Sequence, residues 1–156
     1  MNKPHKQGKS TRTNLDIGAI YATFWRMVYM SVHRYDSNTT GELLTVMTIA
    51  LLRQADYKPT SADLVEITGL PKSSVSRYVS RQMRKGYVTE VVDPEDRRRR
   101  RLTPTTKGRK EEQWHQNQTQ ELARLSSAAL RGLGKSKDPV SDLKNILLGI
   151  RGSAKK

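Results

Sequence analysis

The chain has 156 residues, a formal net charge of +14 and no cysteine, and 35% of its residues are hydrophobic. That length suits one domain or two small ones, and the lack of cysteine excludes disulfides, cysteine-ligated zinc and thiol redox sensing. Because the apolar content is low and there is a single Phe, we expect a second subunit to cover part of the apolar surface.

The N-terminal segment carries no recognisable targeting signal. Residues 1–13 are basic and polar, and we expect a disordered tail there. They lack the apolar core of a signal peptide, and no apolar run reaches the roughly 18–20 residues of a membrane span. We therefore expect a soluble cytoplasmic protein without a membrane partner.

Two helices are predicted at the start of the ordered chain. The first begins near Asn14, a favourable N-cap residue, and ends near residues 36–38. The second runs from Thr40 to about Arg53 and is apolar nearly all round, which indicates burial on more than one side. In the first helix, three- and four-residue spacing places these apolar side chains on one face: Ile17, Ile20, Tyr21, Phe24, Met27 and Val28.

A helix-turn-helix pattern follows. Thr60 and Asp63 have the spacing of a capping box at a helix start, and Gly69 is suited to end that helix in the left-handed conformation. Pro71 suits the first turn of the next helix, which should stop at Gly86. We expect this second helix to turn four side chains toward the core: Val75, Tyr78, Val79 and Met83.

A basic β-hairpin and three further helical stretches complete the chain. The predicted strands are residues 87–92 and 98–103, joined by the tip Asp93–Arg97. Thr105 can cap a long helix that is broken at Gly132 and Gly134. Asp138 precedes a last helix with a narrow apolar seam, formed by Val140, Leu143, Leu147 and Ile150.

These elements predict a mainly α fold with a small β-hairpin wing, of the winged helix-turn-helix type. Residues 40–104 would form the DNA-binding region. Residues 14–38 and 105–151 would form a helical dimerisation region, and residues 152–156 a second tail.

Positive charge is concentrated in residues 72–110, which hold thirteen Lys or Arg and four acids. Positive charge concentrated on a helix-turn-helix is typical of a DNA-binding face. In such a motif the second helix lies in the major groove of the DNA. A solvated basic helix face is the plain alternative, but the capping box, the glycine turn and the serine-rich helix start occur together. The groove-facing residues, none of which we expect in the core, are Lys72, Ser73, Ser74, Ser76, Arg77, Ser80 and Arg81.

Five consecutive arginines, residues 97–101, lie in the hairpin. Charges this dense repel one another, so a polyanion is the expected partner; a solvated loop or a nuclear localisation signal is the alternative. A wing tip can place an arginine in a narrow minor groove. The wing residues expected at DNA are Asp96, Arg97, Arg98 and Arg100.

Residues 60–110 resemble the winged-helix core of MarR-type transcriptional regulators. The resemblance lies in LPKSSVSRYVSRQMRKGYV (Leu70–Val88), the wing segment DPEDRR and a Thr-x-x-Gly helix start. It implies that Asp96 orients Arg98 for the minor groove. The Leu-Thr that follows the wing in the family could fall on residues 102–103 or 104–105. The second frame keeps the spacing to Arg98 and Gly108, which means that Pro104 replaces the usual leucine.

The resemblance also implies a small-molecule effector, frequently an aromatic acid or a phenol, held between the dimerisation and DNA-binding regions. Arg26 and His33 could pair with an anion. Core packing or a subunit interface is the other role open to each lining residue. The residues that could line such a pocket are Tyr21, Trp25, Arg26, His33, Met47 and Trp114.

Catalytic and metal-binding patterns are absent from the sequence. The three histidines lack metal-ligand spacing, and there is neither a Gly-rich phosphate loop nor a nucleophile elbow. Glu111 and Glu112 need no role beyond solvation or the helix dipole. We expect no metal, no cofactor and no enzymatic activity.

The function expected from these features is sequence-specific regulation of transcription, most simply repression, by a homodimer on double-stranded DNA. Two-fold symmetry predicts a pseudo-palindromic operator with half-sites about one helical turn apart. An effector would release the DNA by favouring a different spacing of the two DNA-binding lobes. The alternatives are a non-specific architectural DNA-binding protein and a winged-helix protein that acts through protein contacts.

Overall fold

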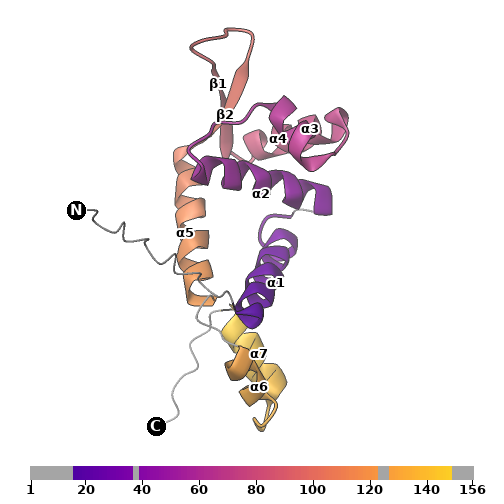
Figure 1. Ribbon diagram of the computed structural model, residues 1–156, viewed down its shortest axis with the longest axis vertical. Helices are drawn as coiled ribbons and strands as arrows, with labels where there is room; N and C mark the ends of the chain where they lie inside the picture. The colour runs from indigo at the N-terminus through magenta and orange to yellow at the C-terminus, as the bar shows by residue number, and fades with distance from the viewer. Residues whose placement is uncertain (1–15, 37–38, 123–126, 149–156) are drawn as a thin grey trace, which may run out of the picture.

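The computed structural model describes residues 16–36, 39–122 and 127–148, in which seven helices and one two-stranded sheet occur (Figure 1). The wing stands at one end of the molecule, with α2, α3 and α4 beneath it, and α6 and α7 lie at the other end. The mainly α fold with a small β-wing is confirmed. In chain order the elements are α1 (Ile17–His33), α2 (Thr40–Gln54), α3 (Ser61–Thr68), α4 (Lys72–Arg84), β1 (Val88–Val92), β2 (Arg100–Pro104), α5 (Thr106–Leu122), α6 (Ser127–Leu133) and α7 (Pro139–Leu148).

Asp16 sets the start of α1. Its Oδ1 accepts hydrogen bonds from the backbone N–H of Gly18 at 2.8 Å and from the backbone N–H and hydroxyl of Ser127, both at 2.7 Å. One carboxylate therefore caps the first turns of both α1 and α6. The helix starts later than the predicted start near Asn14, which lies outside the described residues.

The predicted capping box at the start of α3 and the predicted glycine at its end are both present. Thr60 Oγ1 accepts from the backbone N–H of Asp63 at 3.2 Å, and Asp63 Oδ2 accepts from the backbone N–H of Thr60 at 2.7 Å. Gly69 ends the helix with φ at 66°, in the left-handed region. Pro71 is the N-cap residue of α4, one position earlier than the first-turn place expected for it.

The core of the helix-turn-helix joins four elements. Ile49 of α2, Leu64 of α3, Val75 and Val79 of α4 and Leu102 of β2 are buried together. Tyr78 is also buried, and half-buried Met83 packs against the same cluster. All four side chains predicted to turn inward from α4 therefore do so.

The wing is an antiparallel hairpin in which Val88 pairs with Pro104 and Val92 with Arg100. The return strand begins two residues later than predicted, at Arg100. The reason lies in the tip, where Asp96 accepts hydrogen bonds from the backbone N–H groups of Arg98 at 3.0 Å and Arg99 at 2.9 Å. These bonds hold the chain in a turn and delay the strand.

The C-terminal part contains separate helices where one long helix was predicted. Leu122 ends α5 and Ser127 begins α6, where the carboxylate of Asp16 supplies the N-terminal cap described above. Ala22, Leu122 and Leu147 form a small second core between α1, α5 and α7. Ile150, expected in the seam of the last helix, lies outside the described residues.

Several apolar side chains of α1 are exposed, among them Ile17, Ile20, Tyr21 and Phe24. Val140 of α7 is 78% exposed. An isolated exposed apolar residue needs no explanation, but a row of them along one helix indicates a surface that another molecule covers. Within the described ranges, none of the helices is both long enough and apolar enough to cross a membrane.

Candidate nucleic-acid interface

The N-terminal half of α4 presents a hydroxyl-rich, basic surface. Lys72, Ser73, Ser76, Arg77 and Ser80 are exposed, and Ser74 is half-buried. The Arg77 guanidinium carbon lies 5.4 Å from the centre of the Tyr78 ring, which keeps this side chain close to the helix surface. Short side chains let a helix approach base edges closely, and Arg77 is long enough to reach guanine O6 and N7.

Arg81 is held by the protein core, which corrects the expectation that the core does not need it. Its Nη1 donates to Oε2 of Glu42 at 2.7 Å, and the Glu42 side chain is completely buried. Oε1 of Glu42 accepts from the side-chain amide of Gln82 at 3.0 Å. About a third of the Arg81 side chain stays exposed, with 31% of its surface accessible, so a DNA contact stays a prediction for this residue.

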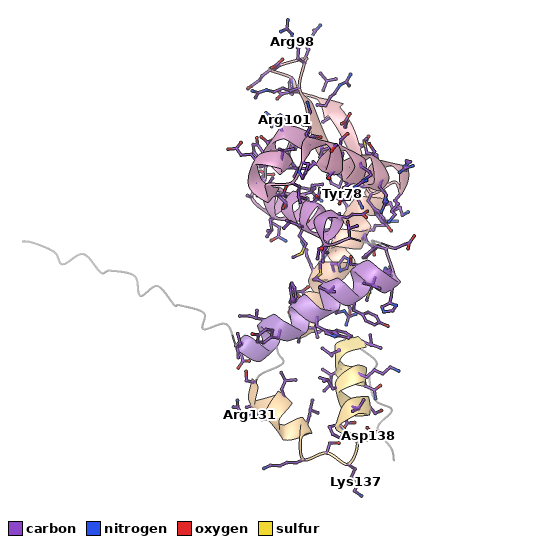
Figure 2. The ribbon with its side chains drawn as sticks, turned by 90° about the vertical axis from the view of Figure 1, so that its right-hand side faces the viewer. Tyr78, Arg98, Arg101, Arg131, Lys137 and Asp138 are labelled. Carbon is purple, nitrogen blue, oxygen red and sulfur yellow. The ribbon has the colours of Figure 1, made fainter. Side chains whose placement is uncertain are left out.

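The wing tip carries four exposed arginines, Arg97 to Arg100. Figure 2 shows Arg98 at the far end of the molecule and Arg101 closer to the helices. The carboxylate of Asp96 binds the backbone N–H of Arg98, and its Oδ2 lies 3.5 Å from Nε of Arg99. Asp96 thus orders the backbone at Arg98, whereas the guanidinium beside it belongs to Arg99.

Arg101 has a different role from the other four arginines. Its Nε donates to Oδ2 of buried Asp93 at 2.5 Å, and its Nη1 donates to the backbone carbonyl of Lys58 at 2.9 Å. Its guanidinium also lies 5.6 Å from the centre of the Tyr57 ring. The hydrogen bonds from the backbone N–H of Glu95 and from Arg101 lower the pKa of Asp93. Arg101 therefore fastens the return strand and the first residue of the wing tip to the segment before α3.

The junction between the wing and α5 is equally tight. Thr105 Oγ1 donates to the carbonyl of Gly86 at 2.5 Å and accepts from the backbone N–H of Gly108 at 3.0 Å. A Cβ on Gly108 would lie 2.0 Å from the carbonyl oxygen of Tyr87. The return strand ends at Pro104, one residue later than predicted, and Thr105 caps α5 as expected. A glycine is needed here because the first turn of α5 touches the wing backbone.

Residues 43–99, from α2 to the wing, match the model of the MarR family. The matched segment covers the helix-turn-helix and most of the wing, just over a third of the chain. Comparison with curated proteins finds no sequence match.

The fold of the chain is similar to that of several solved structures. The Multiple Antibiotic Resistance Repressor, MarR, gives a TM-score of 0.52 at 18% identity over 85% of this chain and 88% of that chain. Regulator Tm0710 from Thermotoga maritima gives 0.51 at 22% identity, over 85% and 88%. FabT from Streptococcus pneumoniae, solved in complex with DNA, gives 0.51 at 19% identity, over 85% and 91%. At these identities the likeness shows the fold.

A cavity of about 750 Å³ lies between α1, α2 and α5. Its apolar wall includes Met27, Leu43, Val46 and Met47. Its polar wall comes mainly from α5, through Glu111, Glu112, His115, Gln116 and Thr119. Of the six residues predicted for an effector pocket, Met47 lines this cavity, and the other five lie outside its lining.

Those five residues occupy other surroundings. Tyr21 and Trp25 are exposed on α1, and Trp25 stacks on Tyr29 with 4.9 Å between ring centres. Buried Arg26 donates to the carbonyl of Leu147 at 2.9 Å and to the side-chain oxygen of Gln118 at 2.7 Å, which joins α1 to α7 and α5. Exposed His33 lies against Tyr29, and Trp114 lies under the guanidinium of Arg34 at 4.5 Å.

A polar cluster that the sequence did not reveal closes one end of the cavity. Tyr35 donates its hydroxyl to Glu111 and lies 2.5 Å from Nε2 of His115. Nε of Arg34 donates to the same glutamate at 2.9 Å. Burial raises the pKa of Tyr35 and lowers that of His115, so both are neutral at pH 7. Burial opposes ionisation of Glu111, but the hydrogen bonds from Tyr35 and Arg34 outweigh it and lower its pKa.

Glu111 and Glu112 therefore have more specific roles than the solvation expected for them, since Glu112 pairs with Arg53 of α2. The i, i+4 spacing of Glu111 and His115 could have indicated a shared face of α5, but their partner Tyr35 is distant in sequence. No group of three or more His, Asp or Glu side chains suited to a metal occurs in the part of the chain that the structure describes.

Proposed function

We propose that this protein is a MarR-type, sequence-specific regulator of transcription that binds double-stranded DNA and acts most simply as a repressor in the cytoplasm. The observation that carries the proposal is that the arginines of α4 and the wing fall into two groups, one exposed and one paired with buried acids. Arg77 lies on the exposed helix surface and Arg98 at the wing tip, whereas Arg81 and Arg101 are tied to Glu42 and Asp93. A protein that needed only a cationic surface would gain nothing from anchoring its recognition elements so rigidly.

The proposed recognition combines two grooves. The residues of α4 from Lys72 to Ser80 would read base edges in the major groove, and Arg98 would enter the neighbouring minor groove. Arg97 and Arg100 are exposed beside it and would contact phosphates. FabT, which has a similar fold, was solved in complex with DNA, and this supports DNA as the partner.

A homodimer would present two such lobes. The exposed apolar residues of α1 and Val140 of α7 lie in the half of the molecule away from the wing, so their pairing with a second copy leaves both wings accessible. Two-fold symmetry then gives a pseudo-palindromic operator with half-sites about 34–36 Å apart, which is one turn of DNA.

We also propose that a small molecule in the cavity weakens DNA binding. The supporting observation is Tyr35, which lines the cavity and whose backbone carbonyl accepts a hydrogen bond from Nζ of Lys85. Lys85 is the C-cap residue of α4. A ligand that displaced Tyr35 would therefore act directly on the end of the recognition helix.

Selection of duplexes from a random pool by the purified full-length protein tests the proposed function. A regulator should enrich one pseudo-palindromic motif. Recovery of DNA without any shared motif would favour the architectural alternative.

A further inference from the structure

The charges around the cavity are already matched within the protein. Among the described residues that line it, the ionisable side chains of the polar wall are Arg53, Glu111 and Glu112, together with His115 and Tyr35. Glu112 pairs with Arg53, and Glu111 pairs with Arg34 just outside the lining. His115 and Tyr35 are neutral, as described above. The wall thus offers a ligand neither an unmatched cation nor an unmatched anion.

The facing walls add no charge. From α1 the cavity receives Thr23, Met27 and Ser31, and from the wing base it receives Tyr87, Val88 and Pro104. The described part of α2 contributes apolar side chains and Gln54 besides Arg53. What these walls offer is an apolar surface with a few neutral hydrogen-bonding groups.

A charged ligand would therefore have to break an existing ion pair. A carboxylate would lie beside Glu111 and Glu112 unless it took Arg53 from Glu112, and an ammonium group would have to take a carboxylate from its arginine. Either exchange leaves one charge of the protein partly buried without a partner, and such charges are costly. A neutral hydroxyl can instead join the existing network, since glutamate oxygens can accept further hydrogen bonds.

We propose that the cavity selects an uncharged amphipathic molecule, with an apolar body and one hydroxyl or amide donor, and that the Arg53–Glu112 pair sets this preference against ions. This inference rests on the proposed effector site and narrows the two ligand classes expected from the sequence, because it favours a neutral phenol-like compound over an aromatic acid. While Arg53 and Glu112 are paired with each other, neither side chain is available to bind a charged ligand.

Calorimetric titration of the full-length protein at pH 7 with three ligands of matched size tests the preference. The probes are 4-propylbenzyl alcohol, 4-propylbenzoate and 4-propylbenzylammonium, which differ in the charge of one group. The alcohol should bind at least tenfold more tightly than either ion; tenfold corresponds to about 1.4 kcal/mol. Equal or tighter binding of benzoate, or failure of the alcohol to bind, would overturn the proposal.

Two reciprocal variants test the role of the ion pair. Glu112→Gln should leave Arg53 available and raise the affinity for 4-propylbenzoate at least tenfold. Arg53→Gln should leave Glu112 available and raise the affinity for the ammonium probe by a similar factor. If both variants keep the wild-type ranking of the three probes, the ion pair does not set the selectivity and that part of the proposal is overturned.

Two further variants locate the effect. Glu66→Gln makes the same carboxylate-to-amide change at an exposed position of α3 and should leave the ranking unchanged. Met47→Trp should fill part of the cavity and abolish binding of the alcohol; retained binding would place the ligand elsewhere and overturn the assignment. These titrations contain no DNA, so their failure is distinguishable from failure of the proposed regulator, which duplex selection measures separately.

Discussion

The completely buried carboxylate of Glu42 on α2 binds the guanidinium of Arg81 on α4, with 2.7 Å between Oε2 and Nη1. A second bond, from the side-chain amide of Gln82 to the same carboxylate, adds to the contact. The recognition helix is therefore joined to the interior by a charge pair as well as by apolar packing. This arrangement sets the orientation of the α4 surface that we propose to face DNA.

Arg81→Ala should destabilise the protein much more than Arg77→Ala. Loss of Arg81 leaves the Glu42 carboxylate buried without its cation, for which about 3 kcal/mol is expected after allowing for the partial exposure of Arg81. Arg77 is exposed, and its removal should change stability by no more than about 0.5 kcal/mol. Urea unfolding monitored by circular dichroism gives both values. Equal stability of the two variants would contradict the structural role of the Glu42–Arg81 pair.

Gly108→Ala should destabilise the protein although alanine favours helices. The new Cβ would lie 2.0 Å from the Tyr87 carbonyl oxygen, so α5 and the wing would have to move apart. Overpacking of this kind typically costs about 1–3 kcal/mol. Gly132→Ala in α6 is the matched control, because a Cβ there meets nothing within 4 Å, and it should be neutral or stabilising by up to about 1 kcal/mol. The opposite order in thermal unfolding would show that the wing–α5 contact tolerates a side chain.

Phe24→Asp should convert the proposed dimer into a monomer. The Phe24 side chain is exposed in the row of apolar residues on α1, and in a dimer the new carboxylate would be buried without a partner, at a cost of several kcal/mol. Ile67→Asp places the same charge on an exposed apolar position of α3 and should leave the sedimentation coefficient unchanged. An unaltered dimer for Phe24→Asp would remove this face of α1 from the interface.

Stability should decline as the pH falls below 6.5 because of His115. Burial lowers its pKa in the folded protein below the ordinary value of 6.5. As the pH falls through 6.5 the unfolded chain therefore takes up a proton before the folded chain does, which favours unfolding. His115→Gln should flatten this part of the stability profile, whereas His33→Gln on the exposed surface of α1 should not. Glu111, whose pKa is lowered below 4.5, adds a separate loss at more acidic pH.

The helices and turns of the winged-helix lobe were more predictable from the sequence than the residues around the cavity. The Thr60–Asp63 capping box and Gly69 act through neighbours within a few residues, so their spacing alone indicates the turn. Arg26 and Tyr35 could not be assigned in this way. Arg26 binds residues 92 and 121 positions away in the chain, and a burial that depends on such distant partners leaves no local pattern.

The five wing arginines illustrate the same limit within one segment. Dense charge predicts a polyanion-binding wing, but only the contact of Arg101 with Asp93 and the Lys58 carbonyl separates a positioning arginine from its exposed neighbours.

In DNA titrations over a range of salt concentrations, Arg100→Ala should lower the salt slope by about one phosphate contact. Arg101→Ala should reduce affinity with the slope unchanged. Identical slopes for both variants would contradict this division.

The central claim is that α4 and the wing read a DNA sequence. Fluorescence anisotropy at about 150 mM salt, comparing the duplex selected from a random pool with a scrambled duplex of equal composition, tests it most directly. The wild-type protein should prefer the selected duplex by at least about 10³-fold. Arg77→Ala should lose about 1–3 kcal/mol on that duplex alone. Equal affinity of the wild type for the two duplexes, with every arginine variant weakened alike on both, would show a non-specific DNA-binding protein.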